Sequence, residues 1–165
     1  MKRRSLIIGG AAALGLGWLL RPQEQGADHS PYFQQLSAAL DRAQLAKPTL
    51  VVDRSRLLAN IRTLRGHIND RFHYRIVVKS LPSLPLLESV IEASGSQRLM
   101  VFHQPFLNRV AAHFPQADVL LGKPMPVAAA HNFYRQFAGG GFDPARQLRW
   151  LLDTPERVKQ YDELA

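Results

Sequence analysis

The stretch Arg75-Ile76-Val77-Val78-Lys79 predicts a short β-strand that ends in a lysine. Its three central residues are apolar and β-branched, which is typical of a strand covered on both faces in a parallel sheet. A lysine in such a place is costly unless it has a chemical task. Burial also favours the neutral amine, which is the form that attacks carbonyl carbons. Lys79 is therefore a candidate active-site residue.

The same pattern, a short apolar run followed by an amphipathic helix, recurs along most of the chain. Further apolar runs cover residues 50–52, 99–102, 119–121 and 148–152. Apolar residues at helical spacing predict helices between these runs, with Gly95 placed to end one helix and Thr154 placed to begin another. Strands that alternate with helices indicate an α/β fold with a parallel sheet.

Polar residues follow the predicted strands, at the edge where parallel α/β folds gather their chemistry. They are Asp53, Lys79, His103, Lys123 and Asp153. The two aspartates stand where helix N-caps are expected, and Lys123 precedes a proline in a predicted solvated loop. His103 either lines a ligand site or is a hydrogen-bonded polar residue at a strand end. Only Lys79 follows a strand whose predicted burial favours a chemical role.

Several segments resemble the fold-type III pyridoxal-phosphate enzymes, which share the alanine racemase amino-terminal domain. The segments are residues 48–53, 57–61, 75–79, 118–124 and 151–158, in the order in which that family has them. The chain is similar in particular to the D-threonine aldolase and D-serine dehydratase-like proteins. In that subgroup the cofactor lysine lies four residues after an arginine, and Lys79 has this spacing from Arg75.

The resemblance implies a partial (β/α)8 barrel of the TIM type over residues 48–165, with about four parallel barrel strands. The strand at residues 50–52 is expected apart from these four, because in the family it joins a separate β domain. A complete barrel takes about 250 residues, and its phosphate site typically comes from loops after strands seven and eight. The phosphate site, and any divalent metal, are therefore expected in a carboxyl-terminal half beyond Ala165.

The resemblance also implies a role for each site residue. Lys79 would be the catalytic Schiff-base lysine for pyridoxal 5'-phosphate, with Arg75 and His103 beside the cofactor and a D-amino acid as substrate. Arg75 has an alternative role as an ion pair inside the barrel. The subgroup carries a histidine two residues after the lysine, where this chain has Leu81. Aldolase, dehydratase and racemase reactions therefore stay open, as do a non-catalytic pyridoxal-phosphate-binding protein and an inactive fragment; the complete enzyme is expected to form a homodimer.

The first 20 residues have the pattern of an export signal or a membrane anchor. A basic start precedes an apolar run over residues 6–20, and Arg3-Arg4 with the residues that follow resembles a twin-arginine signal. We expect a signal or anchor helix over residues 1–21, a linker with a short helix over 22–47, and the barrel domain over 48–165. The protein is accordingly expected to use the export machinery and to be periplasmic or anchored in the inner membrane.

Composition restricts the other classes of function. The chain has 165 residues, 46% hydrophobic and 21% charged, with a formal charge of +8 and no cysteine. This composition is globular, and the lack of cysteine excludes disulfides and thiolate metal sites. Half of the surplus positive charge lies in the leader, at Lys2, Arg3, Arg4 and Arg21. No aromatic residues interleave with the arginines near residues 54–65 as a nucleic-acid groove requires, so we expect no nucleic-acid partner.

Overall fold

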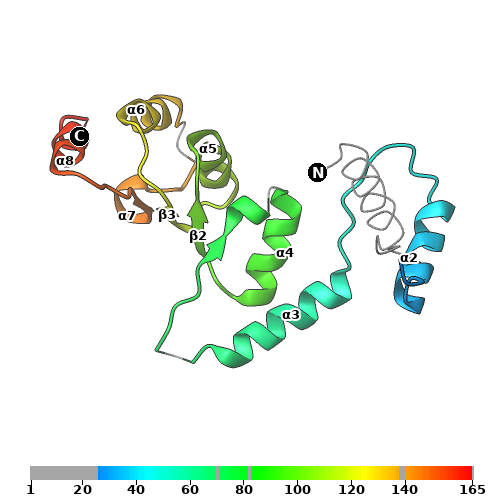
Figure 1. Ribbon diagram of the computed structural model, residues 1–165. Coiled ribbons are helices and arrows are strands. Elements are labelled where there is room, and N and C mark those ends of the chain that lie inside the picture. Colours follow the sequence, from blue (N-terminus) through cyan, green and yellow to red (C-terminus); the bar gives the residue numbers. More distant parts are fainter. Residues whose placement is uncertain (1–25, 70, 82, 138–139, 165) are drawn as a thin grey trace, which may run out of the picture. The chain divides into compact units, whose positions relative to one another are not determined.

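The computed structural model describes residues 26–69, 71–81, 83–137 and 140–164 (Figure 1). The chain divides into two units, Met1–Val51 and Val52–Ala165. The predicted signal or anchor helix lies outside the described residues. Among the described helices, none combines the length and the apolar composition needed to cross a membrane.

The described part of the first unit contains one helix, α2 (Pro31–Arg42). It confirms the short helix predicted within residues 22–47, and Gln44 just beyond it has a positive φ of 49°. The strand predicted at residues 50–52 is wrong. These residues form no strand, and Leu50 is 82% exposed. A β-strand is held by hydrogen bonds to a neighbour, and no described segment pairs with this one.

The second unit is built on one parallel sheet of four strands, which confirms the predicted α/β fold. The strands are β1 (Ile76–Val77), β2 (Arg98–Val101), β3 (Asp118–Leu121) and β4 (Leu148–Arg149), in spatial order β1-β2-β3-β4. One row of the register runs through Ile76, Leu99, Val119 and Leu148. Within the sheet, β1 and β4 are the two edges.

Helices lie before, between and after the strands. They are α3 (Arg54–His67), α4 (Leu84–Ser94), α5 (Gln104–His113), α6 (Val127–Gln136), α7 (Pro144–Gln147) and α8 (Pro155–Asp162), with a 3-10 turn, η1 (Val78–Ser80), after β1. The two predicted helix ends are confirmed. Gly95 takes the left-handed conformation, φ 67°, directly after α4, and the Thr154 side chain accepts a hydrogen bond from the Arg157 N–H at the start of α8.

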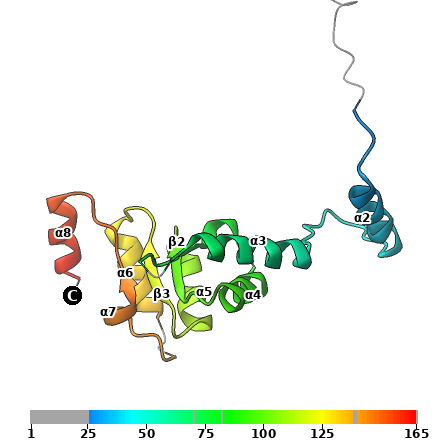
Figure 2. The same cartoon turned by 90° about the horizontal axis from the view of Figure 1, so that it is seen from below.

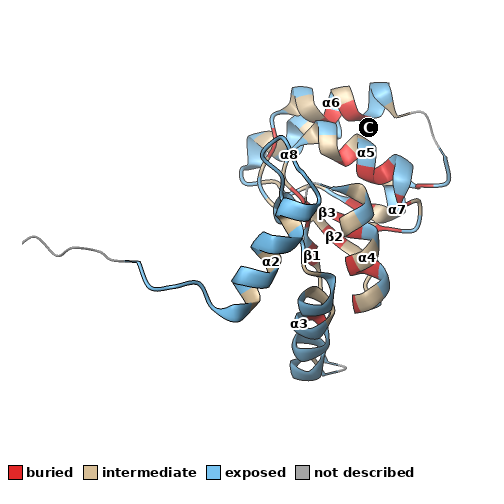
Figure 3. Ribbon diagram, turned by 90° about the vertical axis from the view of Figure 1, so that its right-hand side faces the viewer, coloured by how far each residue is buried: buried red, intermediate tan, exposed pale blue. Residues whose placement is uncertain are grey.

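The two faces of the sheet differ in burial (Figure 3). The covered face packs against α4, α5 and α6 and carries side chains that are at most 8% exposed: Ile76, Val78, Leu99, Val101, Val119, Leu121 and Leu148. The residues between them point to the opposite side, which we call the open face, and are half-buried or exposed: Arg75, Val77, Arg98, Met100, Asp118, Leu120 and Arg149.

This difference corrects one prediction. The strand at Lys79 was expected to be covered on both faces, whereas Val77 is 37% exposed. The reason is topological: right-handed crossovers between strands in the order 1-2-3-4 place every connecting helix on the same face. The other face of such a sheet is the one that lines the interior when a barrel closes.

Candidate functional site

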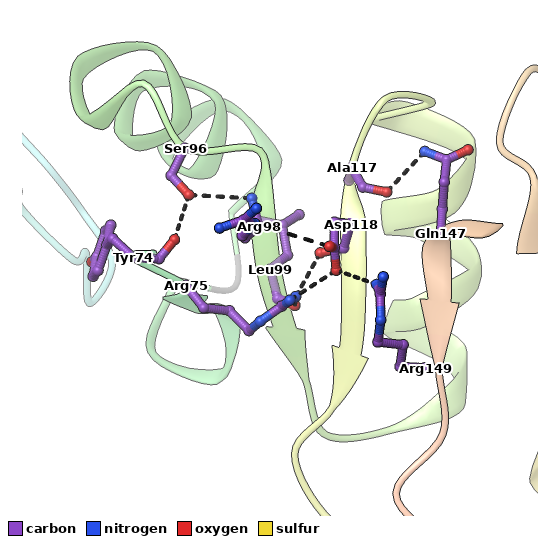
Figure 4. A network of polar contacts seen from close by, with 9 residues as sticks. All are labelled: Tyr74, Arg75, Ser96, Arg98, Leu99, Ala117, Asp118, Gln147 and Arg149. Atoms are coloured by element: carbon purple, nitrogen blue, oxygen red, sulfur yellow. Dashed lines mark hydrogen bonds and ion pairs between the residues drawn. The ribbon is translucent and has the colours of Figure 1, made fainter. Parts of the chain in front are cut away.

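One carboxylate organises the open face where the strands begin (Figure 4). Asp118, the first residue of β3, accepts hydrogen bonds from Arg75 and Arg149, each at 2.8 Å. The Nε atom of Arg98 lies 4.0 Å from its other oxygen. The three guanidinium groups come from β2, from β4 and from the residue before β1, so the Asp118 carboxylate ties the four strands together.

Arg75 is more firmly held than an ion pair alone requires. Its Nη1 donates to two main-chain carbonyls, that of Leu99 at 2.9 Å and that of Asp118 at 2.8 Å. The side chain is only 20% exposed. These contacts correspond to the ion-pair role that was the alternative for Arg75.

Lys79 lies at the opposite end of β1, where the strands end. It belongs to the 3-10 turn η1 and is exposed, so the expectation that it is buried is wrong. Burial fails because β1 stops at Val77 and is an edge strand. The Lys79 Nζ atom lies 4.8 Å from the ring centroid of Phe102, the residue that follows β2.

Arg75 and Lys79 are consequently at two different ends of the open face. Arg75 precedes β1, whereas Lys79 lies in η1 beyond the other end of that strand. The guanidinium of Arg75 points to Asp118 and to the carbonyls at the strand starts. The structure therefore does not bring these two predicted cofactor residues together.

His103 follows β2 and serves as the N-cap of α5. Its Nδ1 accepts a hydrogen bond from the Phe106 N–H at 3.1 Å, which assigns the proton of the neutral imidazole to Nε2. The side chain is exposed at the same edge as Lys79. His103 is thus a hydrogen-bonded residue at a strand end, one of the two alternatives considered, and Nε2 makes no hydrogen bond to any described residue.

The other residues predicted to follow strands have simple roles. Asp53 caps α3 by accepting from the Arg56 N–H at 3.0 Å, as expected. Asp153 does not cap a helix, because Thr154 takes that position in α8. Lys123, after β3, is exposed. The edge where the strands end therefore carries two amines, those of Lys79 and Lys123. Within the described residues, no three His, Asp or Glu side chains gather where they could hold a metal ion.

Two residues of this edge were missed from the sequence, Phe102 and Gly122. Phe102 forms the surface that faces the Lys79 amine, and Gly122 follows β3 directly beside the Phe102 ring. A glycine at a strand end is a sequence signal for close approach of another group. A phenylalanine after an apolar run carries no such signal.

A cavity of about 630 Å³ lies at the other end, near the strand starts. Its walls include Arg65, His73, Tyr74, Arg98 and Asp118. None of the strand-end residues Lys79, His103 and Lys123 lines it. The size of this cavity is typical of a ligand site, but the reactive amine is at the opposite edge of the sheet. Chemistry at a parallel sheet gathers where strands end, so we place the candidate site at Lys79.

No protein-family model, no curated protein and no solved structure matches this chain. The fold class and the candidate site therefore rest on the chain's own residues, and its membership of the pyridoxal-phosphate family stays a prediction.

Proposed function

We propose that the four strands are the first half of an eight-stranded barrel, and that Lys79 is the lysine that binds pyridoxal 5'-phosphate in an enzyme acting on D-amino acids. The observation that carries the proposal is the position of Lys79: a primary amine in the turn that follows the first strand of a sequentially ordered parallel sheet, on the edge where barrel enzymes place their chemistry.

The arrangement of the sheet supports the barrel. All four strands are parallel and in chain order, and their helices cover one face only. A doubly wound sheet reverses its strand order and has helices on both faces. The open face has the mixture expected of a barrel interior, with charged residues at the strand starts and a next row in which apolar Val77, Met100 and Leu120 end at Arg149.

The described residues fit the aldehyde end of the cofactor. The Lys79 amine is accessible and has an aromatic ring beside it, and no carboxylate is within ion-pair distance of it among the described residues. The proposal places the phosphate cradle in loops after later barrel strands. Arg75, held by Asp118, would keep the strands in register under the site.

Bound pyridoxal phosphate supplies an electron sink for bonds that break at the substrate α-carbon. Lys79 is the residue that would hold the cofactor, and its Nζ would serve as a general base toward one face of the substrate. Racemisation, retro-aldol cleavage and elimination all use these steps, and the proposal covers the three reactions together.

Absorption spectroscopy tests this function on the protein as its gene encodes it. We expect a visible absorption band on addition of pyridoxal phosphate, which D-amino acids shift and Lys79→Ala abolishes. Lys123→Ala is the matched control, because it removes an exposed amine at a neighbouring strand end, and it should leave the band unchanged. A band that D-amino acids do not shift would mean a non-catalytic carrier. Loss of the band in Lys123→Ala and not in Lys79→Ala would refute the assignment.

We also propose that residues 1–21 direct the protein to or across the inner membrane, on the basis of their basic start and apolar run. A fusion of residues 1–30 to a reporter should appear in the membrane or periplasm. Replacing Arg3-Arg4 by two lysines should block export if the twin-arginine route is used. A reporter that stays soluble in the cytosol would contradict the proposal.

A further inference from the structure

The side chain of Lys79 is positioned by one aromatic ring. Phe102 is half-buried after β2, and the Lys79 Nζ lies above its ring at 4.8 Å from the centroid. The negative face of an aromatic ring attracts an ammonium group at this distance. A lysine at an exposed turn otherwise samples many rotamers, so this contact favours those that keep the amine over the strand ends.

The ring can lie there because residue 122 is glycine. A Cβ atom at Gly122 would stand 2.5 Å from Cζ of Phe102 and 2.9 Å from Cγ of Met100, both far shorter than a van der Waals contact. Gly122 is not among the described glycines with a positive φ. Space for the ring, and not backbone conformation, is therefore what requires glycine at this position.

We propose that Phe102 is a positioning residue for Lys79 and that its ring, admitted by Gly122, is a platform for a planar aromatic aldehyde held at Nζ. The inference deepens the proposed function of Lys79 and rests on it. A ring attached at Nζ would contact the face of Phe102, and aromatic pairs are favourable beyond the area that they bury. The ligand class selected is aromatic aldehydes over small aliphatic ones.

The test compares two aldehydes, pyridoxal and formaldehyde, in the full chain. Each condenses with an amine and loses water, and borohydride then supplies the hydride that reduces the C=N bond to a stable secondary amine. Peptide mass spectrometry measures the ratio of pyridoxal to formaldehyde modification at Lys79 and at Lys123. No ring among the described residues faces Lys123, so its ratio is the internal reference.

We expect the ratio at Lys79 to exceed that at Lys123 by about two- to fivefold, which corresponds to roughly 0.5–1 kcal/mol. Phe102→Leu should remove this preference, and Phe102→Tyr should retain it because the ring is kept. Gly122→Ala should reduce it, since the ring must swing aside. Phe106→Leu, a matched change on α5, should have no effect. Phe102→Met replaces the leucine variant if that one does not fold.

A preference that survives Phe102→Leu and Phe102→Met would overturn the platform, as would an equal loss in Phe106→Leu. The two proposals fail separately. If the ratio depends on Phe102 but the protein gains no visible band with pyridoxal phosphate, the platform stands and the proposed function is wrong. If the visible band depends on Lys79 but the modification ratio is unchanged in the Phe102 variants, the platform is wrong and the function stands.

Discussion

The two ends of the open face are built on opposite electrostatic principles. Where the strands begin, three arginines converge on Asp118, so each guanidinium has a carboxylate partner although the cluster as a whole stays positive (Figure 4). Where the strands end, Lys79, His103 and Lys123 are exposed, and none has a carboxylate partner among the described residues. Figure 2 shows the second unit from below, with β2 and β3 labelled beside α5 and α6. Ion pairs between strands hold a fold together, whereas an amine without a carboxylate partner is available for chemistry.

The covered face should dominate stability. Leu99→Ala removes a fully buried side chain from the centre of the sheet and should lower the free energy of unfolding by about 2–5 kcal/mol. Met100→Ala, the next residue on the open face, should cost about 1 kcal/mol because much of its side chain is not packed. Urea unfolding of both variants in the 165-residue chain measures the difference. Equal losses would mean that the open face is covered.

The strand-start network should come second. Asp118→Asn leaves three arginines without a counter-charge and should cost about 1–3 kcal/mol, less than for a fully buried pair because Asp118 is 30% exposed. Added salt should reduce the difference in free energy of unfolding between Asp118→Asn and the wild type. Asp153→Asn is the matched control, since Asp153 is exposed and makes no hydrogen bond with the described residues. If the network contributes nothing to stability, Asp118→Asn and Asp153→Asn should have the same urea unfolding midpoint.

His103 should matter for stability through its cap. His103→Ala should cost about 1 kcal/mol, the usual loss for an N-cap, and His103→Asn should restore most of it because asparagine is a good N-cap residue. Thermal or urea unfolding measures both. If asparagine stabilises no better than alanine, the hydrogen bond to the Phe106 N–H is not the role of His103, and a ligand role would gain support.

The smallest effect concerns Tyr161 on α8, whose hydroxyl donates to the Met125 carbonyl at 3.1 Å. Burial raises the pKa of the Tyr161 phenol above its usual 10.0, although Arg157 acts in the opposite direction. At a pH above the usual phenol pKa, the unfolded chain loses the phenolic proton before the folded chain does. The free energy of unfolding should therefore fall slightly as pH rises. A titration by ultraviolet absorbance should show one phenol ionising above the others, and Tyr161→Phe should remove that step.

Much of the fold could be predicted from the sequence because its signals are local. Apolar runs and helical spacing fixed four parallel strands and their helices, and the ends at Gly95 and Thr154 follow from backbone and capping preferences. The error at residues 50–52 has a clear cause. An apolar, β-branched segment has the same pattern whether or not a neighbouring strand exists to pair with it.

The site was less predictable because it depends on register. The run at residues 75–78 does not reveal whether one face or both are covered, so the exposure of Lys79 was missed. Likewise, Arg75 meets Asp118 only because of the register of β1, β2 and β3. The contact of Lys79 with Phe102 crosses between strand ends 23 positions apart, a distance over which no sequence spacing gives a signal.

Covalent labelling tests the central claim, that Lys79 binds the cofactor, most directly. The protein is mixed with one equivalent of pyridoxal phosphate, reduced with borohydride, digested and mapped by mass spectrometry. The pyridoxyl group should lie on Lys79 and not on Lys47 or Lys123, and Lys79→Arg should leave the chain unlabelled because a guanidinium forms no Schiff base. Label on Lys123, or an equal spread over the three lysines, would contradict the assignment of Lys79.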